Sequence, residues 1–302
     1  MAENILEALD DALAGGEPID EIVGAFFQLA RDADREVLDQ MIDSLDERIG
    51  KYPLERVGSL ALLAGALVER GADPRRFPRS VFDHALAQLE SIEGPADPRE
   101  LSEAFHQAER AIAAALGRSP ELRRTLPQKP ALAAKLKRYQ ERYGFLGKIV
   151  QVLDDEPLLV LHPKSRRGFR FRMSGIGDNF ELHLRLLEQL AGEGPDRIPG
   201  IVPRGGSVTS DWQLANWSAL RPGGELDTTD HGRTWIWNEG VPADIASFEG
   251  ERVVLLGPSS IQRGWNAHAV FPWMNGALDD QRTLPSAEVD ALLERMVRAG
   301  SA

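Results

Sequence analysis

Proton-transfer chemistry could come from four residues in the C-terminal part of the chain: His231, Glu239, Asp244 and His268. All six tryptophans occur around them, between residues 212 and 273. Burial beside such large side chains would shift the pKa values of these groups, as a general acid or base requires. If the protein is an enzyme, we expect these four residues to be catalytic and the substrate to be a small anionic molecule.

No spacing typical of a catalytic motif accompanies these residues. The segment GIGDN (175–179) lacks the third glycine of the dinucleotide-binding fingerprint, because Phe180 stands in its place. The sequence contains neither a phosphate-binding GxxxxGKS/T loop nor a GxSxG nucleophile turn, although Ser259 and Ser260 follow an apolar run. The histidines show no metal-ligand spacing. We therefore predict neither a metal nor a cofactor, and we keep catalysis as an alternative.

A basic segment is the first candidate binding surface. The stretch LHPKSRRGFRFRM (161–173) contains Lys164, Arg166, Arg167, Arg170 and Arg172. Because side chains alternate along a strand, its last two arginines should share one face, opposite the phenylalanines and the methionine. Arginine binds carboxylate or phosphate through two parallel hydrogen bonds, so this face could receive an anionic partner. In the alternative interpretation, the segment packs against the acidic N-terminal helices or keeps a sheet edge soluble.

The tryptophan-rich region is the second candidate binding surface. Trp235 and Trp237 would point the same way on a strand, and Arg263, Trp265 and Asn266 follow in loop-like positions. Tryptophan is costly to expose and frequent in binding hot spots, so such a cluster forms either a core or a recognition surface. A core is the commoner use in a small domain. The polar neighbours favour a ligand cleft.

These candidates require two kinds of structural element to position them. Apolar residues recur at helical spacing up to about residue 117, which predicts an all-α domain over residues 1–125, either a bundle or a short array of helical hairpins. Residues 126–302 contain short β-like runs, including a hairpin over residues 157–175, and these do not alternate regularly with helices. We therefore predict a two-domain α+β protein whose second domain has a largely antiparallel sheet.

Composition and charge limit the classes of function. With 42% hydrophobic and 27% charged residues and no cysteine, the sequence predicts a folded protein without disulfides, and the cytoplasm fits this best. The acidic residues near the start are untypical of a secretory signal, and no apolar run approaches a membrane span. The net charge of −12 weighs against nucleic-acid binding by the molecule as a whole. Charge is nevertheless segregated, with residues 1–47 strongly acidic and residues 118–148 basic.

Together these features predict a non-catalytic binding or accessory protein that recognises an anionic partner. The expected partner is an acidic peptide or protein segment, which the protein would present to separate enzymes. The hairpin could accept such a peptide as an additional strand. The alternatives are an enzyme acting on a small anionic substrate in the tryptophan-rich domain, and a nucleic-acid-binding protein. A homodimer formed through apolar helical faces is left open.

Overall fold

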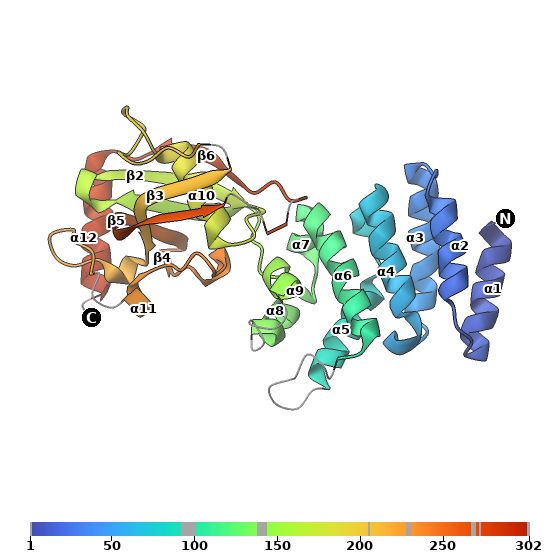
Figure 1. The fold of residues 1–302 in the computed structure, drawn as a ribbon. Coiled ribbons are helices and arrows are strands. Elements are labelled where there is room, and N and C mark those ends of the chain that lie inside the picture. Colours follow the sequence, from blue (N-terminus) through green and yellow to red (C-terminus); the bar gives the residue numbers. More distant parts are fainter. Residues whose placement is uncertain are drawn as a thin grey trace. The chain divides into compact units, whose positions relative to one another are not determined.

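The computed structural model describes residues 2–91, 101–137, 144–204, 206–227, 231–266, 270–271 and 273–300. They form two compact units, residues 1–150 and 151–302. The first is helical, and the second combines a mixed sheet with helices (Figure 1). The predicted α+β class is confirmed. The division falls after Val150 instead of residue 125, because the helices that follow residue 119 pack with the helical unit.

Consecutive antiparallel helices build the N-terminal unit (Figure 1). Those described are α1 (Ala2–Gly15), α2 (Asp20–Ala30), α3 (Arg35–Ile49), α4 (Leu54–Arg70), α5 (Arg79–Glu90), α6 (Glu103–Arg118), α7 (Pro120–Thr125), α8 (Lys129–Lys137) and α9 (Gly144–Ile149), with a 3-10 turn η1 (Pro74–Arg76). Side chains of Asp34, Ser102 and Ser119 cap the starts of α3, α6 and α7. Gly71 ends α4 in the left-handed conformation, with φ of 117°.

Helices α4 and α6 approach each other closely because small residues line their contact. Gly58 and Gly65 of α4 face Ala104 and Ala111 of α6. A Cβ atom added at Gly65 would lie 2.6 Å from Ala111 Cα, and one at Gly58 would lie 2.7 Å from Ala104 Cα. Alanine at either glycine would therefore push the two helices apart.

One six-stranded sheet organises the described part of the C-terminal unit. Its strands are β1 (Glu156–His162), β2 (Arg167–Ser174), β3 (Ser207–Ala215), β4 (Ser247–Phe248), β5 (Glu251–Asn266) and β6 (Ala277–Thr283). The order is β3-β5-β1-β2-β6, with β4 beside β5. The β1–β5 pair is parallel and the other pairs are antiparallel. Strands β1 and β2 form the predicted hairpin, joined through the 3-10 turn η3 (Pro163–Ser165).

A helix packs on each face of this sheet. Leu182, Leu186 and Leu190 of α10 (Asn179–Leu190) pack against Phe169 and Phe171 of β2. On the opposite face, α12 (Ser286–Gly300) packs against the alternate residues of β1. The remaining short elements are η4 (Trp217–Ala219), α11 (His231–Thr234) and η5 (Pro242–Asp244). The alternation predicted for β2 is therefore present, with its apolar residues on the α10 face and its arginines on the α12 face.

The strand order contradicts one expectation about the hairpin. Strand β1 lies between β5 and β2, and β2 lies between β1 and β6. Both hairpin strands therefore have hydrogen-bonded neighbours on each side, and neither can accept a peptide as an additional strand. The strands at the ends of this order are β3 and β6, and β4 pairs with β5 alone.

Candidate functional site

The arginines of β2 have acidic partners inside the C-terminal unit. Arg170 Nε lies 2.9 Å from Glu251 Oε1, and its Nη1 lies 2.6 Å from Glu288 Oε1. Arg172 Nη2 lies 2.6 Å from Asp155 Oδ2. These carboxylates come from β5, from the start of α12 and from the turn before β1, and not from the acidic N-terminal helices. The arginines therefore connect elements of their own unit.

The turn that joins β1 to β2 carries Lys164 and Arg166, and Arg167 begins β2. Arg166 pairs with Asp290 of α12, and Arg167 Nη1 donates a hydrogen bond of 3.0 Å to Gly194 O. Lys164 is exposed. Of the five basic residues predicted to bind an anion, four are thus engaged by groups of the chain itself.

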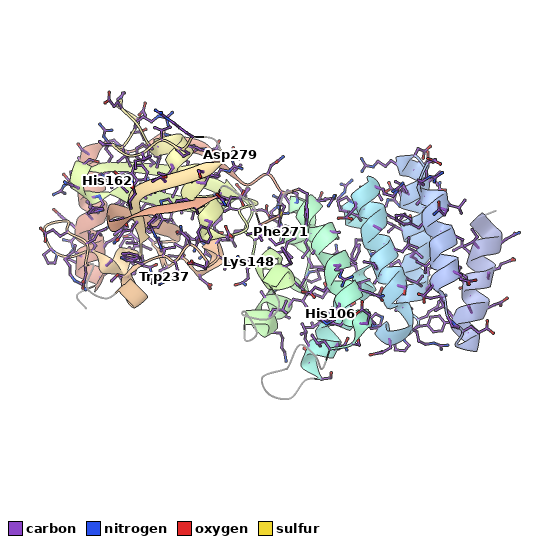
Figure 2. All side chains as sticks on the ribbon, in the orientation of Figure 1. His106, Lys148, His162, Trp237, Phe271 and Asp279 are labelled. Carbon is purple, nitrogen blue, oxygen red and sulfur yellow. The ribbon has the colours of Figure 1, made fainter. Side chains whose placement is uncertain are left out.

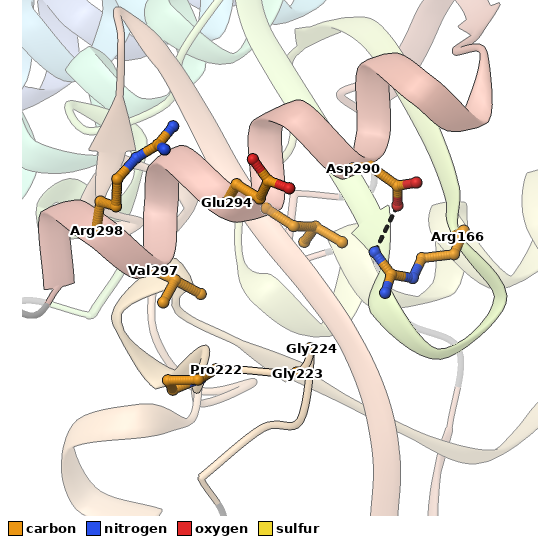
Figure 3. A pocket seen from close by; sticks show the side chains of 9 residues that line it. Arg166, Pro222, Gly223, Gly224, Asp290, Glu294, Val297 and Arg298 are labelled. Carbon is orange, nitrogen blue, oxygen red and sulfur yellow. Dashed lines mark hydrogen bonds and ion pairs between the residues drawn. The ribbon is translucent and has the colours of Figure 1, made fainter.

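Arg166 also lines a pocket of about 400 Å³ between α12 and the turn Pro222–Gly224 (Figure 3). Leu293 and Val297 supply apolar walls, while Asp290, Glu294 and Arg298 supply charges. Two acidic and two basic side chains line the pocket, so it offers no net attraction for an anion.

The tryptophan-rich region assembles a different set of groups, which we call the tryptophan cluster: Trp235, Trp237, Arg263, Trp265 and His183. The Arg263 guanidinium carbon lies 5.2 Å from the ring centroid of Trp235. The rings of Trp235 and Trp237 are 5.6 Å apart, and those of Trp265 and His183 are 4.8 Å apart. Trp237, labelled in Figure 2, is 44% exposed. Four of the predicted ligand-binding residues therefore lie together, whereas Asn266 is exposed at the end of β5.

His183 is the member that the sequence interpretation missed. It is fully buried, and its Nε2 lies 3.0 Å from Ser210 Oγ. Burial lowers the pKa of His183 to about 3, the nearby Asn238 side chain raises it, and the charge of Arg263 lowers it further. The Nδ1 atom of His183 has no hydrogen-bond partner among the described residues. Helical periodicity could have indicated this position, since His183 precedes Leu187 and Leu190 by four and seven residues.

Ser210 and His183 resemble a nucleophile and its base in their contact, but their surroundings disfavour catalysis. Both Ser210 and His183 have no solvent exposure, so a substrate cannot reach the hydroxyl. A histidine with a pKa near 3 is also a poor proton acceptor at neutral pH. The His183–Ser210 contact instead ties α10 to β3.

Arg263 differs from Arg185 and Arg252 of the same unit in forming no ion pair with the described residues. Its Nη1 atom is buried without a hydrogen-bond partner among the described residues, and so are Nε of Arg185 and Nε of Arg252. However, Arg185 pairs with Glu188, and Arg252 lies 2.8 Å from Glu156 and donates to the carbonyl oxygens of Ala243 and Ile245. A buried guanidinium N–H without an acceptor is costly, which makes Arg263 the favoured anion-binding group.

Of the four predicted catalytic residues, the structure describes the side chains of Glu239 and Asp244. Glu239 and Asp244 are both exposed, and Asp244 belongs to η5. The His231 side chain and His268 lie outside the described residues. Among the residues that are described, no three His, Asp or Glu side chains are grouped so as to hold a metal ion.

Among the described helices, none is long and apolar enough to cross a membrane. Comparison with known proteins found no family model, curated protein or solved structure that matches this chain.

Proposed function

We propose that the protein is a non-catalytic recognition protein whose C-terminal unit binds a carboxylate of an acidic peptide or protein segment at Arg263. The observation that carries this proposal is that Arg263 is partly exposed, while the described residues offer it no ion-pair partner and its Nη1 atom no hydrogen-bond acceptor. A guanidinium group binds carboxylate through two parallel hydrogen bonds, and such charge-assisted bonds are stronger than neutral ones.

Arg263 is favoured over the hairpin arginines because no carboxylate among the described residues pairs with it. A ligand carboxylate that approached Arg170 would have to displace Glu251 and Glu288, which the fold already holds at 2.9 and 2.6 Å. At Arg172 it would have to displace Asp155. At Arg263 the ligand would supply an acceptor that the described residues do not.

The tryptophans around Arg263 indicate what should flank the carboxylate. The Trp235 ring lies under the guanidinium and is buried, so it orients the cation and shields it from water. Trp237 packs beside Trp235 and exposes 44% of its surface. Exposed tryptophan and arginine are the commonest anchors of binding interfaces. We therefore expect the bound acidic residue to have an apolar neighbour that contacts Trp237.

An array of capped peptides tests the proposal. Each peptide carries a central Asp or Glu beside an apolar residue, and its matched control carries Asn or Gln in place of the acid. Wild-type protein and an Arg172→Met variant should retain the acidic peptides and not the amide controls. An Arg263→Met variant, checked for folding by circular dichroism, should bind at least about tenfold more weakly.

Two results would contradict the proposal. If Arg172→Met loses binding while Arg263→Met keeps it, the hairpin is the recognition surface. If wild-type protein retains none of the acidic peptides, the protein does not recognise an acidic segment at this site.

A further inference from the structure

The pocket between α12 and the turn Pro222–Gly224 has no role in the proposed function, and Arg263 does not line it. Its volume of about 400 Å³ is in the range of sites that bind small molecules. Leu293 and Val297 form its apolar wall, and Leu293 is only 3% exposed because it also belongs to the core beneath α12. This wall is therefore held in place by the packing of the unit.

The turn opposite α12 contributes backbone and a single proline ring to the pocket (Figure 3). Gly224 N donates a hydrogen bond of 3.1 Å to Arg221 O, which closes the turn. Gly223 and Gly224 have φ of 89° and 85°, a left-handed conformation that glycine adopts without strain. A Cβ atom added at Gly223 would have nothing within 4 Å. This side of the pocket therefore has room for a ligand.

The charged residues of the pocket follow one face of α12. Asp290, Glu294 and Arg298 are spaced four residues apart, so they lie one above another along the helix. Asp290 pairs with Arg166 from the β1–β2 turn (Figure 3). Within the described part of the chain, neither Glu294 nor Arg298 has an ion-pair partner, although a glutamate four residues before an arginine commonly forms one. The pocket thus presents one carboxylate and one guanidinium that the described residues do not neutralise.

From this arrangement we infer that the pocket is a second binding site, which takes a zwitterionic small molecule, an α-amino acid with an apolar side chain. Glu294 binds the ammonium group of this ligand, and Arg298 binds its carboxylate. The two residues are about 6 Å apart along the helix axis, so both charged groups of an amino acid fit between them. The apolar side chain of the ligand contacts Leu293 and Val297. The inference goes beyond the proposed function and does not rest on it.

The balance of charges in the pocket favours a zwitterion over an ion of either sign. Two acidic and two basic side chains line the pocket, so a singly charged ligand meets like charges as well as opposite ones. The Arg166–Asp290 pair contributes no net charge. A molecule that carries both charges forms an ion pair with Glu294 and another with Arg298 at the same time.

Four probes test the inference by NMR titration of the full-length protein. L-leucine carries both charges and an apolar side chain. N-acetyl-leucine lacks the ammonium group, leucinamide lacks the carboxylate, and glycine lacks the side chain. Wild type should bind leucine at least about tenfold more tightly than each of the other three, because each of them omits one of the expected contacts.

Two variants, checked for folding by circular dichroism, should shift this selectivity in opposite directions. Glu294→Gln leaves more basic than acidic residues in the pocket, so it should weaken leucine binding about tenfold and bind N-acetyl-leucine more tightly than wild type does. Arg298→Gln leaves more acidic than basic residues, so it should weaken leucine binding similarly and favour leucinamide. Arg295→Gln is the matched control, because Arg295 also belongs to α12 but pairs with Glu249 and does not line the pocket. It should bind leucine as wild type does.

Three results would overturn the inference. Wild type could show no saturable binding of leucine up to about 10 mM, or it could bind all four probes equally. In the third case, Glu294→Gln and Arg298→Gln would keep the selectivity of wild type. Each result would leave carboxylate binding at Arg263 standing, because that proposal is tested with acidic peptides and a different variant.

Discussion

His183 Nε2 lies 3.0 Å from Ser210 Oγ, and neither side chain is exposed to solvent. The histidine belongs to α10 and the serine to β3, so this contact joins the helix to the sheet beneath it. The Trp265 ring covers the imidazole at 4.8 Å. Protonation would place a positive charge in this core beside Arg263, and for that reason the pKa of His183 falls to about 3.

We predict that the C-terminal unit loses stability as the pH falls from 6.5 towards 3. The pKa of His183 is about 3 in the folded protein against 6.5 in an unfolded chain, so the unfolded state binds more protons in this window. Because of His183, the free energy of unfolding is a few kcal/mol higher above pH 6.5 than at pH 3. Urea unfolding, followed by tryptophan fluorescence at several pH values, should show a shallower pH dependence for His183→Gln. His162, with its pKa lowered to about 4, contributes equally to both proteins; identical pH slopes would refute the prediction.

Glu181 should show the opposite dependence. It is buried at the start of α10, where its Oε2 accepts a hydrogen bond of 3.0 Å from Gly177 N. Burial raises its pKa above the usual value, so the folded state binds more protons than the unfolded state just above pH 4.5. Stability from this group therefore falls as the pH rises through its folded pKa. Glu181→Gln should be more stable relative to wild type at pH 7 than at pH 4, as measured by urea midpoints; a constant difference would contradict this.

The close contact between α4 and α6 predicts a strong effect of one methyl group. Gly65→Ala would place a Cβ atom 2.6 Å from Ala111 Cα, and separating the helices should cost about 1–3 kcal/mol. Gly24→Ala is the matched control, since Gly24 lies within α2 and nothing lies within 4 Å of an added Cβ. The control should stabilise α2 by about 0.5–1 kcal/mol. Unfolding followed by far-ultraviolet circular dichroism measures both, and equal effects would show that the helices do not meet closely.

Arg170 and Arg172 provide a comparison between two arginines on the same face of β2. Arg170 connects Glu251 to Glu288, so Arg170→Leu would leave two partly buried carboxylates facing each other and should destabilise the unit by more than about 1 kcal/mol. Arg172 and its partner Asp155 are more exposed, and Arg172→Leu should change the urea midpoint little. A larger loss at Arg172 than at Arg170 would contradict the structural role assigned to this pair.

The local features of the fold could be predicted from the sequence because neighbouring residues determine them. Alternation along β2 placed Phe169 and Phe171 opposite Arg170 and Arg172, and the structure has them so. The change from helical spacing to short β-like runs indicated two units of different class. The sequence also singled out Arg263 and three of the tryptophans around it, since bulky aromatic and cationic residues there had to form either a core or a site.

Only the tertiary structure decided which arginines have carboxylate partners within the described part of the chain. Glu251 and Glu288 lie 81 and 118 residues from Arg170, and no local pattern predicts that strand order and α12 bring them together. The same packing buries His183 against Ser210, 27 residues away, and leaves Arg263 without an acceptor among the described residues. Composition and periodicity thus determined the elements and their faces. The pairing of charges depends on long-range strand order, which places the candidate site at Arg263 and not on the basic hairpin.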